Sequence, residues 1–453
     1  MQLCRANIYQ LEPTPDQAAA FSRWVGACRY VYNLALEQRR EFWRPGRTFT
    51  YVGQAAELTN LRAEVDWLSD VPVHALQMAV RAVDTAYQRF FAGLGEYPKP
   101  HRKFLHDSFT LPDPSYLGFR RYNKSHGAIR VAKLGWIKLR GWRPLGGELR
   151  SITIRRKAGC WYASIAWQKE AADPLASTLP AAGIDRGIKV FAALSDGRKI
   201  APLNAFKRIE ERLAKAQRRL ARKTKFSANW IKQKAKISRL HVHAANARKD
   251  FLHKRSTEIA KSHGVVKIEH LRVQNMSASA KGTAENPGTN VKAKSGLNRA
   301  ILDQGWGMFA TMLAYKLAER GGELAKVEAA YTSKTCAECG VVDANSRVDQ
   351  ATFVCTGCGH TDNADVNAAR NILQARTLAV EPPKRTLWRV GERQRAPTAN
   401  RNCPNMGDWQ FDSKSARAAF PAALIALGRG QHLGKKRQHP SQEPGLGGRV
   451  GGL

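Results

Sequence analysis

Four cysteines have the types and spacing of a metal site. Cys336 and Cys339 form one Cys-x-x-Cys pair, and after 15 intervening residues Cys355 and Cys358 form a second. A two-residue gap lets one tight knuckle of chain present two sulfurs, and four thiolates complete the tetrahedral shell of Zn²⁺. Because protein ligands fill all four positions, we expect one structural zinc ion and no catalytic role for it.

A redox-active Cys-x-x-Cys pair is the alternative interpretation, but it does not explain why the chain has two pairs. Gly340 and Gly359 each follow the second cysteine of a pair, where glycine tolerates the positive φ that a knuckle needs. His360 is adjacent and not needed as a ligand. The remaining cysteines are interpreted as ordinary buried or tail residues: Cys4, Cys28, Cys160 and Cys403.

Three carboxylates form the second candidate group. Asp185 and Glu269 each end a short apolar strand, and Asp365 begins a helix just past the last cysteine. Hydrolysis of a phosphodiester by two Mg²⁺ ions about 3.5–4 Å apart needs a few carboxylates on rigid elements. Since Mg²⁺ keeps some of its water ligands, three carboxylates suffice. Taken singly, each has a simpler explanation as a turn residue, a solvated strand end or a helix cap, and spacing alone leaves both interpretations open.

The charge balance narrows the class of partner. The chain has 453 residues, enough for about three domains, and its 74 Lys and Arg against 37 Asp and Glu give a net charge of +37. Such an excess favours a polyanion, and nucleic acid is the expected one. A membrane surface is the competitor, but the longest apolar stretch, 418–427, is too short to span a bilayer and contains Pro421.

The first residues of the chain, 1–13, lack the apolar core of a signal peptide. We therefore expect a cytoplasmic protein, in which thiols stay reduced and are free to bind metal.

The elements of the N-terminal part can be predicted from local signals. Residues 3–11 are typical of a strand, and Thr14 with Gln17 forms a capping box that starts a helix. A second helix is predicted at 73–91 from its apolar periodicity. Residues 105–168 are rich in β-branched and aromatic residues and predict further strands.

The elements of the second half must position the carboxylates. After the strand that ends at Asp185, a hairpin is predicted to turn at 195–197, and two long helices at 205–262. Residues 277–296 predict a long loop, 298–319 one helix and 323–330 a strand. Within 205–261 there are 18 Lys and Arg against 4 Asp and Glu. A solvated helix surface is the simpler explanation, but this imbalance favours contact with phosphates.

Seven segments together resemble a known family. The chain resembles TnpB, the OrfB-type protein of small insertion sequences and a relative of compact type V CRISPR effectors. The matching segments follow the family's order and cover residues 1–373: Pro13–Gln17, Gly26–Asn33, Gly183–Gly187, Ile268–Leu271, Asp303–Trp306, Tyr331–Cys336 and Asp365–Asn371.

The resemblance implies an α/β fold with an RNase H-like RuvC nuclease domain, inserted helices and a zinc ribbon, preceded by a mixed β-barrel wedge and helical recognition lobe. Its metal ligands match Asp185, Glu269 and Asp365, whereas Asp362 lies nearby without matching. The expected boundaries are 1–175 for the wedge and recognition lobe, 176–335 for the nuclease core with its basic helices, 336–358 for the zinc ribbon, 359–373 for the last nuclease segment and 374–453 for a largely disordered tail.

The resemblance also implies the partners. Family members bind a guide RNA made from the element's end, recognise a short adjacent DNA motif, open the duplex and cut both strands with Mg²⁺. For this chain the expected partners are a guide RNA and target double-stranded DNA. A separate transposase of the same element is a further candidate partner. The expected place of action is the cytoplasm and nucleoid of a prokaryote, with no membrane partner.

The chain departs from the family at two neighbours of the candidate ligands. Arg186 follows Asp185 where a small or apolar residue is common, and His270 follows Glu269 where Asp or Asn is common. The tail beyond Leu373 matches nothing in the family, and we hypothesise that the guide-RNA sequence, and not the protein, constrains it. A transposase that breaks and rejoins DNA, and a non-catalytic nucleic-acid-binding regulator, stay open as alternatives.

Overall fold

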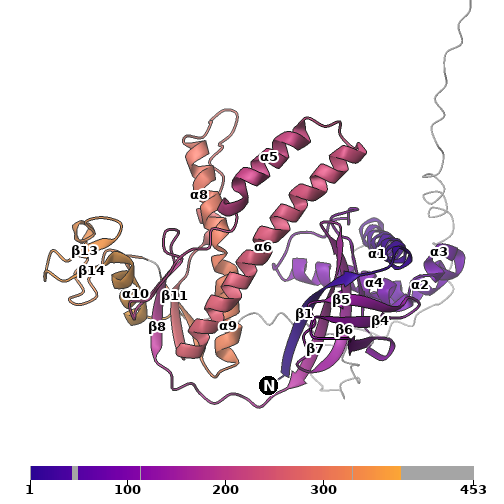
Figure 1. Ribbon diagram of the computed structural model, residues 1–453, viewed down its shortest axis with the longest axis horizontal. Coiled ribbons are helices and arrows are strands. Elements are labelled where there is room, and N and C mark those ends of the chain that lie inside the picture. The colour runs from indigo at the N-terminus through magenta and orange to yellow at the C-terminus, as the bar shows by residue number, and fades with distance from the viewer. Residues whose placement is uncertain (1, 43–48, 113, 329, 379–453) are drawn as a thin grey trace, which may run out of the picture. The chain divides into compact units, whose positions relative to one another are not determined.

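The computed structural model describes residues 2–42, 49–112, 114–328 and 330–378 (Figure 1). The chain opens with strand β1 (Gln2–Glu12) and helix α1 (Pro15–Glu41). The predicted capping box is present at the start of α1. The Gln17 N–H donates to Thr14 Oγ1 at 3.3 Å, and the Thr14 N–H donates to Gln17 Oε1 at 3.0 Å. Two of the free donors at the start of this helix are thereby satisfied.

The N-terminal strands form one antiparallel sheet in the order β2-β6-β7-β1-β5-β4-β3. The strands after β1 are β2 (Ser108–Leu111), β3 (Gly118–Arg121), β4 (His126–Val131), β5 (Gly135–Arg140), β6 (Glu148–Lys157) and β7 (Cys160–Glu170). The expected barrel is wrong, because among the described residues this sheet stays open. Its edge strands β2 and β3 have four residues each, pair on one side only and do not pair with each other.

Helices cover this sheet and bury its aromatic side chains. They are α1, α2 (Tyr51–Glu64), α3 (Asp66–Ser69) and α4 (Val73–Phe91). Phe21 of α1 lies with its ring centre 5.7 Å from that of Phe109 and 5.1 Å from that of Trp161. Each aromatic side chain removes about 150–250 Å² from water, which is worth about 4–6 kcal/mol at about 25 cal/mol per Å². Such contacts therefore contribute strongly to the core of this region.

The second sheet carries the candidate carboxylates. It has five strands in the order β10-β9-β8-β11-β12, namely β8 (Ala181–Asp185), β9 (Ala192–Leu194), β10 (Lys199–Ile200), β11 (Val265–Glu269) and β12 (Glu323–Val327). Strand β11 is parallel to both β8 and β12, whereas β9 is antiparallel to β8 and β10. The predicted turn at 195–197 joins β9 to β10.

Both faces of this sheet are covered, which explains why its strands are almost continuously apolar. On one face, Ile184 and Ile268 join a core with Phe191 and Phe309, whose ring centres are 5.0 Å apart. That core is supplied by helices α6 (Ala228–Ser262) and α9 (Trp306–Ala318). Side chains alternate along a strand, so Gly183 faces the opposite side, where helix α10 (Ala364–Gln374) packs.

The segment before β12 differs from the prediction of one helix at 298–319. The chain forms α8 (Val291–Gln304) and α9, separated by Gly305 at φ +71°. A residue in this left-handed conformation ends a helix. Because α8 begins at Val291, the loop predicted at 277–296 is also shorter than expected. A side chain at Gly305 would approach Leu252 Cδ1 to 3.1 Å, which leaves little room for another residue type.

The described chain ends on the same sheet. Beyond α10, Thr377 forms an antiparallel bridge with Val327, and the Leu378 N–H donates to the Lys326 carbonyl at 2.8 Å. The rest of the tail predicted to be disordered, 379–453, lies outside the described residues. No helix within the described ranges is both long and apolar enough to cross a membrane.

Candidate active site

Parallel pairing of two strands brings Asp185 and Glu269 together. Strands β8 and β11 pair in register, with Ile184 opposite Ile268. Asp185 and Glu269 are the next residues, so both carboxylates leave the same end of the sheet on strands about 4.8 Å apart. Asp185 and Glu269 each end a strand, as the sequence predicts.

Asp365 reaches the same end of the sheet on a helix that has unusually close contact with β8. A Cβ atom added to Gly183 would lie 2.0 Å from the Ala369 carbonyl oxygen and 2.6 Å from the Leu373 nitrogen. Only glycine therefore lets α10 rest on this strand. Asn363 caps the helix by accepting from the Asp365 N–H at 3.3 Å, which places Asp365 in the first turn.

The pKa of Asp185 responds to the other two carboxylates. Burial, followed by the negative charges of Glu269 and Asp365, raises the pKa of Asp185 to about 7. Burial also raises the pKa of Glu269. Both shifts penalise the charged form, so this site favours a cation among the three carboxylates.

The three carboxylates do not form a single tight shell. Among the residues that the structure describes, the one group of three or more His, Cys, Asp or Glu with all ligand atoms within 4.8 Å of one another is the cysteine group. The carboxylate oxygens of Asp185, Glu269 and Asp365 are therefore not all within 4.8 Å of one another.

Two arginines lie against the carboxylates. Arg186, the residue after Asp185, is buried and donates through Nη2 to the backbone carbonyl of Glu269. Arg347 Nη2 lies 3.5 Å from Asp365 Oδ1, and the charge of Arg347 lowers the pKa of Asp185. Neither contact follows from a sequence motif, because both join residues that are distant along the chain.

Glu269 has a further partner in Thr332, whose hydroxyl donates to Glu269 Oε1 at 2.8 Å. Thr332 precedes the first cysteine pair, and α10 holds its segment in place. The Asn371 side-chain amide donates to the carbonyls of Thr332 at 2.9 Å and of Thr335 at 2.6 Å. One helix thus carries Asp365 and also fixes the residue that orients Glu269.

A second asparagine, one helical turn earlier, makes similar hydrogen bonds closer to the cysteines. We call the hydrogen bonds from Asn367 and Asn371 to the segment 332–337 the clamp. Asn367 is fully buried, donates to the Thr335 carbonyl at 2.7 Å and accepts from the Ala337 N–H at 2.9 Å. The two asparagines therefore bind both sides of Cys336 from one face of α10. Their i, i+4 spacing on a helix is visible in the sequence, and buried polar residues at that spacing are the signal that could have identified them.

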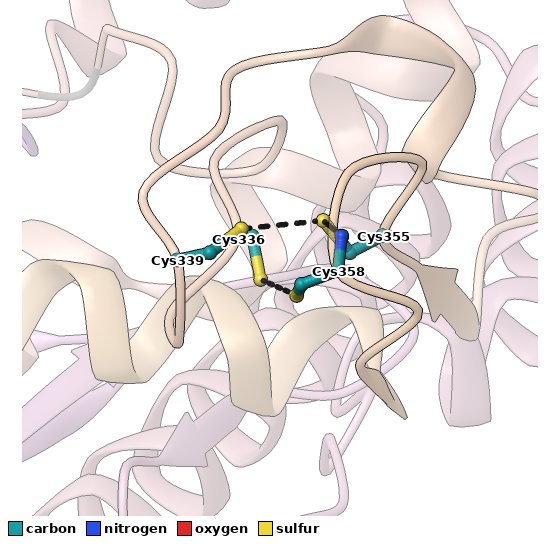
Figure 2. A group of neighbouring side chains, drawn as sticks. All are labelled: Cys336, Cys339, Cys355 and Cys358. Atoms are coloured by element: carbon teal, nitrogen blue, oxygen red, sulfur yellow. Dashed lines mark hydrogen bonds between the residues drawn. The ribbon is translucent and has the colours of Figure 1, made fainter.

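The four cysteine sulfurs converge between two loops (Figure 2). Cys336 Sγ lies 3.8 Å from Cys358 Sγ, and Cys339 Sγ lies 3.5 Å from Cys355 Sγ. Tetrahedral Zn²⁺ with bonds of about 2.3 Å requires sulfurs about 3.8 Å apart, so the group fits this ion. The prediction that these four residues form one cluster is confirmed.

The backbone of both cysteine knuckles has the positive φ that the two glycines predict. Gly340 and Gly359 have φ of +76° and +74°, and their N–H groups each donate to the carbonyl of the first cysteine of the pair at 3.0 Å. The backbone N–H groups of Cys358 and, to a lesser extent, Gly357 donate to Cys355 Sγ and lower the pKa of that thiol to about 6.

The predicted basic helices are present as α5 (Glu210–Ala221) and α6, which lie side by side as an antiparallel pair (Figure 1). From 212 to 249 the sequence has 13 Lys and Arg and no Asp or Glu. Lys232, Lys234 and Lys236 are exposed. Phe226, between the two helices, is 78% exposed. Cations beside an exposed aromatic ring suit phosphates and bases.

Parts of the chain match three family models, and the chain as a whole is similar to known proteins. Residues 164–280 match the family described as "Probable transposase" (OrfB_IS605), residues 306–372 match "Cas12f1-like, TNB domain" and residues 1–47 match "Helix-turn-helix domain". The chain is 41% identical over 379 residues to "Putative RNA-guided DNA endonuclease InsQ" of Escherichia coli K12, covering 83% of this chain and 93% of that one.

The chain belongs to the TnpB family. Another TnpB relative, "Putative RNA-guided DNA endonuclease" of Streptomyces pristinaespiralis, is 37% identical and covers 83% of this chain and 90% of its own length. Among solved structures, the fold resembles the protein of the "Cas12f1-sgRNA-target DNA complex", with a TM-score of 0.51 and 16% identity over 80% of this chain and 84% of that one.

The clamp from α10 generates a prediction for this TnpB-family chain. Asn367→Ala leaves the Ala337 N–H and the Thr335 carbonyl with one partner fewer, so we expect the free energy of unfolding to fall by about 1–3 kcal/mol. Urea unfolding measures this change. The matched control is Gln374→Ala on the same helix, because Gln374 is exposed and its bond to the Ala337 carbonyl is long, at 3.4 Å. This control should leave stability nearly unchanged, and equal stability of both variants would show that the clamp contributes nothing.

The cysteine group generates a second prediction. We expect one Zn²⁺ per chain by elemental analysis, and Cys336→Ser should lower this content and expose the segment 336–359 to protease, because the knuckle loses a ligand. Cys160→Ser, at a cysteine outside the group, is the control and should retain the zinc. Full zinc content in the Cys336→Ser variant would contradict the assignment.

Proposed function

We propose that this protein is an RNA-guided, metal-dependent DNA endonuclease encoded by a transposable element, which hydrolyses DNA phosphodiester bonds at a RuvC-type site. The observation that carries the proposal is the convergence of Asp185, Glu269 and Asp365, from two strands and a helix, at one end of a mixed sheet. The names of the relatives, which are matched over nearly their whole length, support the activity.

The proposed fold of this half is RNase H-like. It is supported by the five-stranded sheet, in which the antiparallel half β10-β9-β8 and the parallel half β8-β11-β12 share the central strand β8. The first strand of the sheet along the chain thus lies at its centre, next to the two other elements that carry carboxylates. The cysteine group is proposed to be a zinc ribbon inserted before α10.

The carboxylates fit Mg²⁺, because they offer oxygen ligands and retain partly exposed positions for water at Asp185 and Asp365. Asp185, Glu269 and Asp365 would hold two Mg²⁺ ions, which supply an activated water and stabilise the leaving oxygen when bound. Thr332 holds one oxygen of Glu269 in a fixed direction. Zn²⁺ in the cysteine group would be structural, since the protein fills its coordination shell.

The proposed partners are a guide RNA and target double-stranded DNA. The solved relative is a complex with guide RNA and target DNA, which supports the same partners here. The positive charge of α5 and α6 supports contact with nucleic-acid backbones, and RNA pairing would then select the sequence. A separate transposase partner and a place in the nucleoid stay predictions.

A transposase that breaks and rejoins DNA is the second candidate, favoured by the family description "Probable transposase". Strand transfer uses the same metals, so an acidic triad fits both functions. Excision of the element by the purified chain without a guide RNA would favour this candidate. The non-catalytic regulator is less well supported, because all three carboxylates are present.

The triad assignment predicts that Asp185→Ala, Glu269→Ala and Asp365→Ala each abolish cleavage of a guide-matched DNA and leave guide-RNA binding intact, since the ligands act on the metals and not on the RNA. Cleavage gels and RNA filter binding measure the two properties. Asp362→Asn is the matched control, because Asp362 pairs with Arg370 at 3.0 Å, and it should keep cutting. Retained cleavage in any one triad variant would overturn that residue's role.

The basic helices generate a further prediction. Replacing Lys232, Lys234 and Lys236 with Gln should weaken nucleic-acid binding and lower the slope of log affinity against log salt by about 0.7–0.9 for each phosphate that the variant no longer neutralises. The control is Lys254→Gln on the same helix, because Lys254 already pairs with Asp250 at 2.8 Å. If the triple variant keeps the slope of the unchanged protein, α6 does not contact phosphates.

A further inference from the structure

Arg186 is a buried charge in the wall of the carboxylate site. It follows Asp185 directly, and its residue surface is only 7% exposed. Nη2 donates to the Glu269 backbone carbonyl, and Nε has no hydrogen-bond partner among the described residues. The side chain is therefore fixed between the two strand ends, with part of its hydrogen-bonding capacity unused.

Hydrogen bonding does not explain why a guanidinium is buried here, since a buried charge costs several kcal/mol unless an opposite charge offsets it. An arginine guanidinium stays protonated in proteins. Asp185 precedes Arg186 at the end of β8, and Glu269 ends the paired strand β11, so the two strand ends that Arg186 joins are the ones that carry carboxylates.

Arg347 provides a contrast at the other side of the site. Its side chain is 29% exposed, it comes from the loop between the cysteine pairs, and it reaches Asp365 at 3.5 Å. Arg347 also donates through Nη2 to the Gln350 carbonyl at 3.1 Å, so it is held by its own loop. Arg186 instead is buried at the end of β8 and is held by the Glu269 carbonyl of the paired strand.

We propose that Arg186 is a fixed internal counter-ion of the carboxylate site, which holds Asp185 and Glu269 together before metal binds and limits the affinity for divalent ions. The inference rests on the proposed metal site. Each ionised carboxylate adds a charge of about −1 and Arg186 adds about +1 with or without metal, so the protein tolerates the metal-free state but attracts cations less strongly. Arg186 acts through the carboxylates and is a positioning residue.

If Arg186 has this role, removing its charge should lower the stability of the metal-free protein and raise its affinity for divalent ions. Without Arg186 the metal-free protein should be less stable, because the carboxylates lose their neutralising charge. The same variant should bind divalent ions more tightly, because the site is more negative. A side chain with only a packing role would lower stability with and without metal alike and would not raise metal affinity.

The experiment uses the full chain with its cysteine group loaded with zinc. Arg186→Gln and Arg186→Lys are compared with the unchanged protein by thermal unfolding in chelator and in saturating Mg²⁺, and by Mn²⁺ titration followed by electron paramagnetic resonance. For Arg186→Gln we expect a lower midpoint in chelator, a larger gain on adding Mg²⁺, and Mn²⁺ affinity higher on the order of tenfold. Arg186→Lys keeps the charge and should stay near the unchanged protein in Mn²⁺ affinity.

Arg248→Gln is the matched control. Arg248 pairs with the buried carboxylate of Asp303 and not with a triad carboxylate, so its loss should lower both midpoints and leave Mn²⁺ affinity unchanged. If Arg186→Gln is unfolded in chelator and folds on addition of Mg²⁺, this outcome also supports the proposal, because it is the expected loss of metal-free stability at its largest. Unchanged or weaker Mn²⁺ binding by Arg186→Gln would overturn the inference.

Asp185→Ala separates this inference from the proposed function. If Asp185→Ala removes Mn²⁺ binding, the metal site is where we propose it, and the Arg186 variants test the counter-ion role alone. If Mn²⁺ binds Asp185→Ala as tightly as the unchanged protein, the proposed metal site itself is wrong and the inference fails with it.

Discussion

The carboxylate site depends on the contact between α10 and Gly183 of β8. The helix backbone lies so close to this strand that any side chain at Gly183 would collide with it. This contact places the first turn of α10, with Asp365, beside the strand ends that carry Asp185 and Glu269. Two of the three carboxylates meet through sheet pairing alone, but the third arrives only because one residue lacks a side chain.

The same helix connects the carboxylates to the cysteine group. Asn367 and Asn371 bind the backbone on both sides of Cys336, and Thr332 in that segment donates to Glu269. The cysteine group is therefore more than an independent module, because its first knuckle and the orientation of Glu269 share one set of hydrogen bonds. Distortion of the knuckle would be transmitted to Glu269 through Thr332.

Local rules explain what the sequence could predict. The capping box at Thr14, the strand ends at Asp185 and Glu269 and the two cysteine pairs each depend on neighbours a few residues away. The resemblance to the TnpB family then indicated which acidic residue near α10 to choose, since Asp362 and Asp365 are alike by spacing alone.

What the sequence could not predict depends on contacts between distant residues or on backbone conformation. The left-handed Gly305 divides a helix that apolar periodicity predicts as continuous. The open N-terminal sheet follows from two short edge strands that do not pair. The Thr332 contact joins residues 63 positions apart, and the buried guanidinium of Arg186 binds the backbone carbonyl of Glu269, 83 positions away.

The central claim is that Asp185, Glu269 and Asp365 share divalent ions. The most direct measurement is an anomalous difference map from crystals of the full protein soaked in Mn²⁺, with the cysteine group holding zinc. We expect Mn²⁺ peaks within bonding distance of all three carboxylates, at the carboxyl end of β8 and β11. Mn²⁺ peaks elsewhere, with none in contact with these residues, would contradict the claim.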